Sequence, residues 1–347
     1  MEKLYSNAIV FFGHPDKICD QLSELLLSEY VKKDENSRCG IEFMGGGKGK
    51  IFVTGEVTSN ADVDVKNLVK KYVTNIDKSY ENYEIVDNIG KQSLDIAMGV
   101  DTGGAGDNGM MFGYASDDTE FLLPKAMIIL QKLSVEYKKL VKDNDSFKAD
   151  GKAQITGVYD DDFRLKRIKS FTICYQNTEQ NRKETDDIIK GIALEICISY
   201  DISVDEFYIN PTGRFEIGGF VGDAGLTGRK IVVDSYQSFA NVGGGNYNGK
   251  DMTKVDRSGA YKARELAKRF LKEKNLKWCE VQLSYSIGMD RPMAIYVDSS
   301  IGNIHVDDSA YVECKPKNII KDLKLIEMIK SDRFLEKATY GHFGISE

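Results

Sequence analysis

The sequence contains few histidines and no closely paired cysteines. It has three histidines in 347 residues, and its six cysteines are scattered without a C-x-x-C pair. Zinc sites are built mainly from cysteine and histidine side chains, so a zinc site is not expected. Scattered cysteines in a chain of this length predict reduced thiols in the core of a cytosolic protein. Any bound metal is expected to be a hard cation held by carboxylate and phosphate oxygens.

The sequence also lacks an excess of positive charge and any long hydrophobic run. Lys and Arg number 47 against 54 Asp and Glu, which gives a net charge of -7. No nucleic-acid partner is expected, because phosphate contacts need a domain-wide excess of basic residues. No stretch approaches about 18 consecutive apolar residues, and the N-terminus does not have the pattern of a signal peptide. We therefore predict a cytoplasmic protein with no membrane span and two or three subdomains.

Glycine beside charged residues is what the sequence has in abundance. Residues 210–234 (NPTGRFEIGGFVGDAGLTGRKIVVD) hold six glycines between Arg214, Asp223, Arg229 and Lys230. Glycine allows positive φ angles and lets a ligand approach the backbone, and cations at such turns suit a polyphosphate. The apolar end of this run predicts a strand at 231–233. The alternative interpretation is a tight, solvated loop between two strands.

A helix is predicted to begin at Pro15, because proline suits the first helical turn and apolar residues recur at helical spacing from Ile18. His14 then lies at a helix N-terminus, where anions bind favourably. Asp16 and Asp20 lie four residues apart on one face. The alternative is that His14 and Asp16 only cap the helix.

The remaining chain predicts strand pairs that are each followed by a helix. This pattern occurs three times, before residue 100, before residue 210 and after residue 278, and indicates repeated α+β units with sheets covered on one face. Strands are expected at 8–12, in a hairpin over 39–60, from 150, at 168–176, 280–287 and 293–297, and helices at 63–73, 121–141, 185–200, from 253 and at 319–329.

Cations and isolated acids stand at many of the predicted turns and helix starts. Together they indicate a site for an extended polyphosphate with divalent cations, and acids that hold an ammonium group. The residues alone thus predict a nucleotide-handling enzyme. The cations are His14, Lys152, Arg214, Arg229, Lys230, Lys250 and Lys254, and the acids are Asp16, Glu42, Glu56, Asp107, Asp150, Asp223 and Asp256.

A phosphate-loop ATPase or kinase is a further hypothesis. G-x-x-x-x-G-K occurs from Gly244 to Lys250, but Asp251 follows, so the hydroxyl that would hold Mg²⁺ is absent. Such an enzyme would release ADP from ATP.

Motifs along nearly the whole chain resemble those of the S-adenosylmethionine synthetase (methionine adenosyltransferase) family. They occur in family order from about Gly13 to Gly344, and several are long and specific. The motifs are GHPDKICDQ, GEVTS, GAGDNGMMFGYA, LLPKAM, NPTGRFEIGG, GDAGLTGRKIVVDSY, GGGNYNGKDMTKVDRSGAYKAR, QLSYSIG and YGHFG.

The resemblance implies that methionine sulfur attacks C5′ of ATP and displaces triphosphate, which is then hydrolysed to pyrophosphate and phosphate. Catalysis would be alignment plus stabilisation of charge. The implied catalytic residues are His14, Lys152, Arg229 and Lys250. The implied ATP-binding residues also include Asp150, Arg214, Phe215, Asp223, Lys230, Asn246 and Ile287. The implied methionine-binding residues are Glu56, Met98, Asp107, Asp223 and Lys254.

The resemblance also implies two Mg²⁺, held by Asp16 and Asp256, and a K⁺ held by Glu42. The implied fold is α+β, with three similar subdomains of strand pairs and helices around a pseudo-threefold axis. The expected ranges are 1–101, 105–217 and 218–347, with structural units discontinuous in sequence. A homodimer with active sites at the interface is expected, and a tetramer built as a dimer of dimers stays open.

The chain departs from the family pattern in several places. Phe11 and Phe12 replace the usual Ser-Glu, Met98 replaces a glutamine that contacts methionine, and Val242 replaces a common histidine. The segment between Asp101 and Gly104, where the family has a mobile lid, is about five residues shorter than usual. These changes predict an active synthetase with weaker methionine binding. The alternative is a non-catalytic paralogue that acts as a partner-binding subunit.

Overall fold

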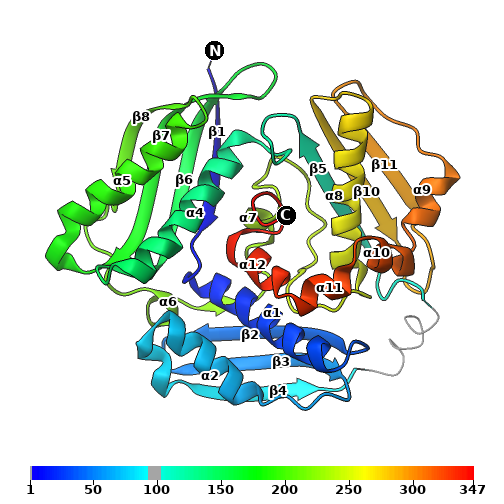
Figure 1. Ribbon diagram of the computed structural model, residues 1–347, viewed down its shortest axis with the longest axis horizontal. Helices are drawn as coiled ribbons and strands as arrows, with labels where there is room; N and C mark the ends of the chain where they lie inside the picture. Colours follow the sequence, from blue (N-terminus) through cyan, green and yellow to red (C-terminus); the bar gives the residue numbers. More distant parts are fainter. Residues whose placement is uncertain (1, 93–102) are drawn as a thin grey trace.

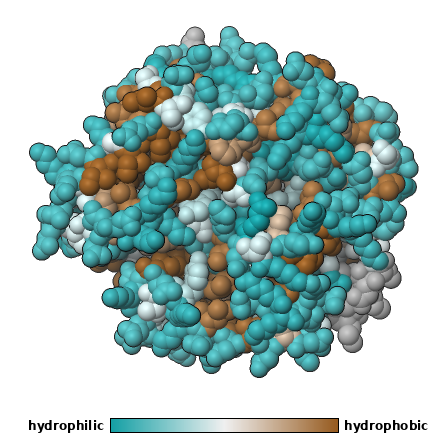
Figure 2. Space-filling view, in the orientation of Figure 1, coloured by the Kyte–Doolittle hydropathy of each residue, from teal (hydrophilic) through white to brown (hydrophobic). Residues whose placement is uncertain are grey.

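The computed structural model describes residues 2–92 and 103–347, which form three blocks of sheet and helix around a common centre (Figure 1). In each block the helices lie over one face of the sheet. The predicted α+β fold with three similar subdomains about a pseudo-threefold axis is confirmed. The side seen in Figure 1 is largely hydrophilic, with scattered hydrophobic groups (Figure 2).

The first block is built on a four-stranded sheet. It contains β1 (Lys3–Val10), β6 (Phe147–Tyr159), β7 (Leu165–Asn177), β8 (Ser203–Ile209), α4 (Lys125–Asp143) and α5 (Arg182–Ile198). The strand order is β1-β6-β7-β8, in which only β7 and β8 run parallel. Because β1 joins strands from the middle of the chain, this block is discontinuous in sequence.

The second block contains the predicted hairpin. Its elements are α1 (Pro15–Lys33), β2 (Arg38–Gly46), β3 (Lys50–Thr58), α2 (Val65–Ile76), β4 (Glu84–Gly90) and β9 (Gly225–Leu226). The sheet order is β4-β3-β2-β9, and β2 pairs antiparallel with β3. Alternate residues such as Ile41 and Phe43 are buried, while Glu42 and Met44 are exposed, as a sheet covered on one face requires.

The third block has a three-stranded sheet in the order β11-β10-β5. Its elements are β5 (Gly109–Ser116), α8 (Val255–Glu273), β10 (Trp278–Tyr285), β11 (Ala294–Ser299), α9 (Asp308–Glu313) and α10 (Pro316–Asp322). The remaining short elements are α6 (Gly219–Gly222), α7 (Ile231–Asp234), α11 (Leu325–Lys330), α12 (Arg333–Tyr340) and the 3₁₀ turns Lys78–Asn82 and Glu179–Asn181.

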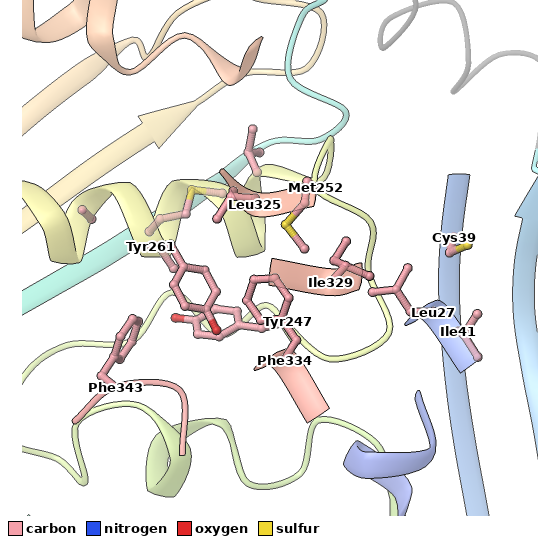
Figure 3. Close-up of a cluster of buried hydrophobic side chains, with 14 of the residues drawn as sticks. Leu27, Cys39, Ile41, Tyr247, Met252, Tyr261, Leu325, Ile329, Phe334 and Phe343 are labelled. Atoms are coloured by element: carbon pink, nitrogen blue, oxygen red, sulfur yellow. The ribbon is translucent and has the colours of Figure 1, made fainter. Parts of the chain in front are cut away.

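Among the described residues, the buried hydrophobic side chains form two cores. One fills the first block, and the other runs through the second and third blocks. In the larger core, Tyr247, Tyr261, Phe334 and Phe343 gather near the centre of the molecule (Figure 3). All six cysteines are free thiols and five of them are buried, as the sequence predicts.

The strand predicted at 231–233 is wrong. These residues form the single helical turn α7, in which Asp234 N donates to Lys230 O at 2.8 Å. The turn places Ile231 against the larger core and Val233 against the core of the first block. Contact with two separate cores outweighs the strand preference of β-branched residues.

Two predicted helix limits also need correction. The helix expected over 319–329 is two helices, α10 and α11, separated at Lys324, whose φ of 51° lies in the left-handed region. The helix expected from residue 121 begins at Lys125, directly after Pro124, because proline restricts the preceding residue and suits a helix start.

Candidate active site

The glycine-rich run 210–234 folds as successive turns beside the start of α1. Three of its glycines, Gly213, Gly219 and Gly228, have positive φ angles of 91°, 57° and 83°. Residues with a Cβ rarely adopt such angles, so glycine at these positions lets the run turn sharply. A Cβ on Gly225 would lie 2.2 Å from Pro15 O, which shows how closely the run approaches α1.

A pocket of about 170 Å³ lies between the start of α1, β6 and this run. It brings together five of the predicted ligand-binding residues from three separate parts of the chain. They are His14, Asp150, Lys152, Phe215 and Asp223.

Asp150 is the buried acid of this pocket. Its Oδ2 accepts a hydrogen bond from Gly219 N at 2.8 Å. Burial raises the pKa of Asp150 to about 6, although the backbone amides of Gly219 and Gly151 and the charge of Lys152 oppose the rise. A carboxylate in this position can accept further hydrogen bonds from a ligand in the pocket.

Asp16 lies next to the pocket and is tied to two of the predicted cations. Its Oδ1 accepts from Leu226 N at 2.9 Å and lies 3.2 Å from Arg229 Nε. Lys230 Nζ donates to its Oδ2. The first cluster is our name for Asp16, Arg229 and Lys230 together with the five pocket residues His14, Asp150, Lys152, Phe215 and Asp223.

His14 caps α1, since its Nδ1 accepts from Asp16 N at 3.2 Å. Burial lowers the pKa of His14 to about 4, and the positive charges of Lys230, Lys152 and Lys17 act in the same direction, whereas Asp16 opposes them. At neutral pH the ring is therefore neutral, and its Nε2 can carry a proton for donation to an oxygen in the pocket. The cap interpretation is confirmed, and the binding role of His14 stays a prediction.

A second cluster forms where the loop of residues 244–250 meets α8. Lys250 Nζ donates to Asp256 Oδ2 at 2.6 Å. Lys254 Nζ donates to Asp251 Oδ2 at 2.9 Å. Glu56 lies here as well, because Glu56 and Lys254 both pack against Gly40. A Cβ on Gly40 would lie 2.8 Å from Glu56 Oε1 and 3.5 Å from Lys254 Cε.

Asp107 and Ile287 lie at the edge of the second cluster. Asn108 Oδ1 accepts from Ile287 N at 2.9 Å, which joins the loops that carry the two residues. Gly109 then approaches Asp256, whose Oδ1 would be 3.5 Å from a Cβ on that glycine. Both Asp107 and Ile287 are exposed.

The other predicted residues are not part of either cluster. Arg214 is exposed and bonded to Glu216 at 2.8 Å. Asn246 packs on Gly228, where a Cβ would lie 2.8 Å from Asn246 Cβ. Glu42 is exposed on the open face of β2. Met98 is outside the described residues.

Several buried charged residues near the clusters were not predicted from the sequence. Asp20 was noted only for its spacing from Asp16, and Glu24, Arg257 and Asp234 were not singled out. Glu24 pairs with Arg257 at 2.9 Å, and Lys17 pairs with Asp234. The only signal in the sequence was the spacing of four residues between the acids at positions 16, 20 and 24 of the predicted helix.

Each proposed magnesium position offers only one protein carboxylate, Asp16 at one and Asp256 at the other. Within residues 2–92 and 103–347, no group of three or more His, Cys, Asp or Glu side chains could enclose a metal. Mg²⁺ often takes one or two protein carboxylates and completes its shell with phosphate oxygens and water. Asp16 and Asp256, each beside cations that suit phosphate, meet that requirement, whereas Glu42 offers one carboxylate with its other oxygens still to be supplied.

Outside residues 1 and 93–102, no helix combines the length and apolar character needed to cross a bilayer.

The fold and site define an α+β protein of three sheet-and-helix blocks with two charged clusters. Three family models match it in order: the N-terminal domain of S-adenosylmethionine synthetase over residues 2–97, the central domain over 102–215 and the C-terminal domain over 217–347. The chain belongs to the S-adenosylmethionine synthetase family.

Similar proteins cover the chain almost end to end. S-adenosylmethionine synthase of Clostridium tetani is 39% identical over 380 residues, which span 99% of this chain and 95% of the relative. The proteins of that name from Nocardioides sp. and Mycoplasmopsis synoviae are each 38% identical, with 99% of this chain and 93% of each relative covered. The Clostridium alignment is longer than this chain of 347 residues, so the relative contains segments that this chain lacks.

Proposed function

We propose that this protein makes S-adenosylmethionine from ATP and L-methionine. Methionine sulfur attacks C5′ of ATP, the C5′–O bond breaks, and the triphosphate leaves and is hydrolysed to pyrophosphate and phosphate. The observation that carries the proposal is the match of all three family domains to a chain whose first cluster gathers cations around a pocket. The reaction needs no protein nucleophile, and the described site contains cations rather than an activated serine or thiol.

The first cluster would bind the nucleotide. Lys152, Arg229 and Lys230 carry the positive charge that stabilises the leaving triphosphate. His14, neutral at physiological pH, donates a hydrogen bond to the oxygen on which negative charge develops. Asp150 and Phe215, with Arg214 at the edge, would lie around the adenosine, as would Asn246 and Ile287.

The second cluster would complete the site. Lys250 is assigned to the phosphates, and Lys254 to the methionine carboxylate side. Glu56 and Asp107 would bind methionine, and Asp223 of the first cluster would hold its ammonium group. Met98 remains assigned to the methionine pocket and lies outside the described residues.

We further propose that each active site forms between two copies of the chain. The first cluster lies at α1 and β6, and the second lies at the start of α8, so one chain presents the two on different elements. A homodimer that places the first cluster of one copy against the second cluster of the other would join all the assigned residues. A tetramer of two such dimers is compatible with the same sites.

Two Mg²⁺ and one K⁺ are proposed as cofactors, with Asp16 and Asp256 as magnesium ligands and Glu42 as the potassium ligand. Bound Mg²⁺ supplies positive charge to the phosphates. In this structure Arg229 and Lys230 contact Asp16, and Lys250 contacts Asp256. These cations therefore have to turn from the carboxylates toward phosphate oxygens when ATP binds. A cytoplasmic location is proposed from the scattered free cysteines.

A product assay tests the function directly. The full-length protein is incubated with ATP and Mg²⁺, with and without L-methionine. We expect S-adenosylmethionine, pyrophosphate and phosphate only when methionine is present. ADP would instead indicate an ATPase or kinase, and no turnover, together with a cellular role that survives Lys152→Ala, would favour the non-catalytic paralogue.

A further inference from the structure

The buried face of α1 carries three carboxylates. Asp16, Asp20 and Glu24 are four residues apart, so they lie along one side of the helix. All three are fully buried. Buried charges lose their hydration, and apolar residues of similar volume often stabilise a core equally well or better. Their presence on a central helix therefore indicates a role beyond packing.

Asp20 is bonded to the loop that carries two of the proposed phosphate ligands. Its Oδ1 accepts a hydrogen bond from Gly228 N at 2.8 Å, directly before Arg229. One turn further, Ser23 Oγ lies 2.8 Å from Thr227 Oγ1. Two residues of α1 thus fix two consecutive residues of the loop.

Glu24 makes the corresponding bond to the other cation-bearing loop. Its Oε1 accepts from Gly249 N at 3.2 Å and lies 2.9 Å from Arg257 Nη1. The same Nη1 donates to Lys250 O at 3.0 Å, and the guanidinium lies 3.9 Å from the ring centroid of Phe334. Glu24 and Arg257 therefore bond to the backbone of Gly249 and of Lys250, respectively.

Both loops have glycine in the left-handed region at the bonded position. The φ angles are 83° at Gly228 and 76° at Gly249. Glycine has more backbone freedom than other residues, so an unanchored loop of this kind would sample many conformations. A buried carboxylate that accepts from the glycine amide selects one of them.

We propose that Asp20 and Glu24 are positioning residues that hold the loops of Arg229–Lys230 and of Lys250 in the geometry that binds triphosphate. The proposal rests on the phosphate-binding role given to these cations above. Because the loops are held in advance, binding does not have to order them, and the affinity for triphosphate is higher. One helix would thus set the positions of the cations in both clusters.

Binding of inorganic tripolyphosphate with Mg²⁺ to the full chain tests this, with Kd measured by calorimetry. In Asp20→Leu and Glu24→Met the acceptor is lost and the volume is largely kept. We expect Kd to rise about tenfold in each, which is the effect of a displaced ionic contact. Asp20→Asn and Glu24→Gln keep an acceptor oxygen and are expected to stay within about twofold of the wild type.

Ser28→Ala is the matched control. Ser28 is buried on the same helix, but its Oγ donates to Ile329 O at 3.2 Å, away from both loops. This variant should lose stability without any change in the Kd for tripolyphosphate. Wild-type affinity in Asp20→Leu and Glu24→Met would overturn the proposal.

If the apolar variants do not fold, amide hydrogen exchange in the wild-type protein tests the proposal instead. Positioning requires the Gly228 and Gly249 amides to be protected as strongly as the core amides of α1, and exchange at the rate of exposed loops would overturn it. A protein that binds tripolyphosphate as expected but makes no S-adenosylmethionine would contradict the proposed function and leave the positioning role intact.

Discussion

At the residue scale, the raised pKa of Asp150 in the candidate site makes the stability of the protein depend on pH. Burial raises its pKa to about 6, against about 3.9 in an unfolded chain. Between these values the folded protein keeps a proton that the unfolded chain releases. The contribution of Asp150 to the free energy of unfolding therefore falls as pH rises from about 4 to about 6 and is level above that.

Asp150→Asn should remove this part of the pH dependence. Relative to the variant, the wild type should lose on the order of 2 kcal/mol of unfolding free energy as pH rises through that window. Urea denaturation of both proteins at pH 4, 5, 6 and 7 measures the difference. Parallel curves for the two proteins would contradict the assignment.

Gly249 is a second position at which one residue determines the local geometry. A Cβ there would lie 2.1 Å from Ile41 O and 2.9 Å from Ser23 Cβ, and φ is 76°. Gly249→Ala should cost about 3 kcal/mol of unfolding free energy, because strain and overlap both act. Synthetase activity should fall as well, since Lys250 would be displaced.

Gly244→Ala is the control for Gly249→Ala. Gly244 has a φ of 90°, but a Cβ would meet nothing within 4 Å. Only the conformational strain then remains, about 1 kcal/mol. Chemical denaturation of both variants separates strain from overlap, and equal losses would show that overlap is unimportant.

At the element scale, the end of β1 is fixed to α4 by an aromatic pair. Phe11 follows β1, is fully buried and stacks on Tyr137 with ring centroids 4.2 Å apart. It fastens β1, which leads into His14, to the core of the first block.

Phe11→Ser should destabilise this protein. The loss is expected to be about 4 kcal/mol, because a large ring leaves a cavity beside Tyr137. Ile198→Ser, on a side chain that is 62% exposed, should change stability by no more than about 0.5 kcal/mol. Urea midpoints measure both, and a Phe11→Ser protein as stable as the wild type would refute the packing argument.

At the scale of the whole molecule, the two clusters predict complementation between inactive chains. Lys152→Ala disables the first cluster and Lys250→Ala the second, so each variant alone should be inactive. In a mixed dimer with shared sites, one site has both defects and the other has neither. Equal co-expression gives about half mixed dimers, and so about a quarter of wild-type activity.

Tagged copies of the two chains allow the mixed dimer to be purified and assayed for S-adenosylmethionine. If each site instead lay within one chain, every site of the mixed dimer would carry a defect. Absence of recovered activity in a purified mixed dimer would therefore contradict sites shared between copies.

Much of the local structure followed from the sequence. The helix from Pro15, the hairpin of β2 and β3 and the free buried cysteines were predicted, because apolar periodicity and turn residues act over short distances. The motifs also indicated the family and the three-block fold. Asp16, Arg229 and Lys230 were assigned to one site, and the structure brings them within contact.

Only the tertiary structure decided the rest. Residues 231–233 form a helical turn because Ile231 and Val233 pack against two different cores. The strand propensity of these residues is weaker than such packing. The roles of Asp20 and Glu24 were hidden because their partners, Gly228 and Gly249, are more than 200 residues away. A sequence specifies which residues can bond, but the bonds that join distant segments exist only after the core has brought those segments together.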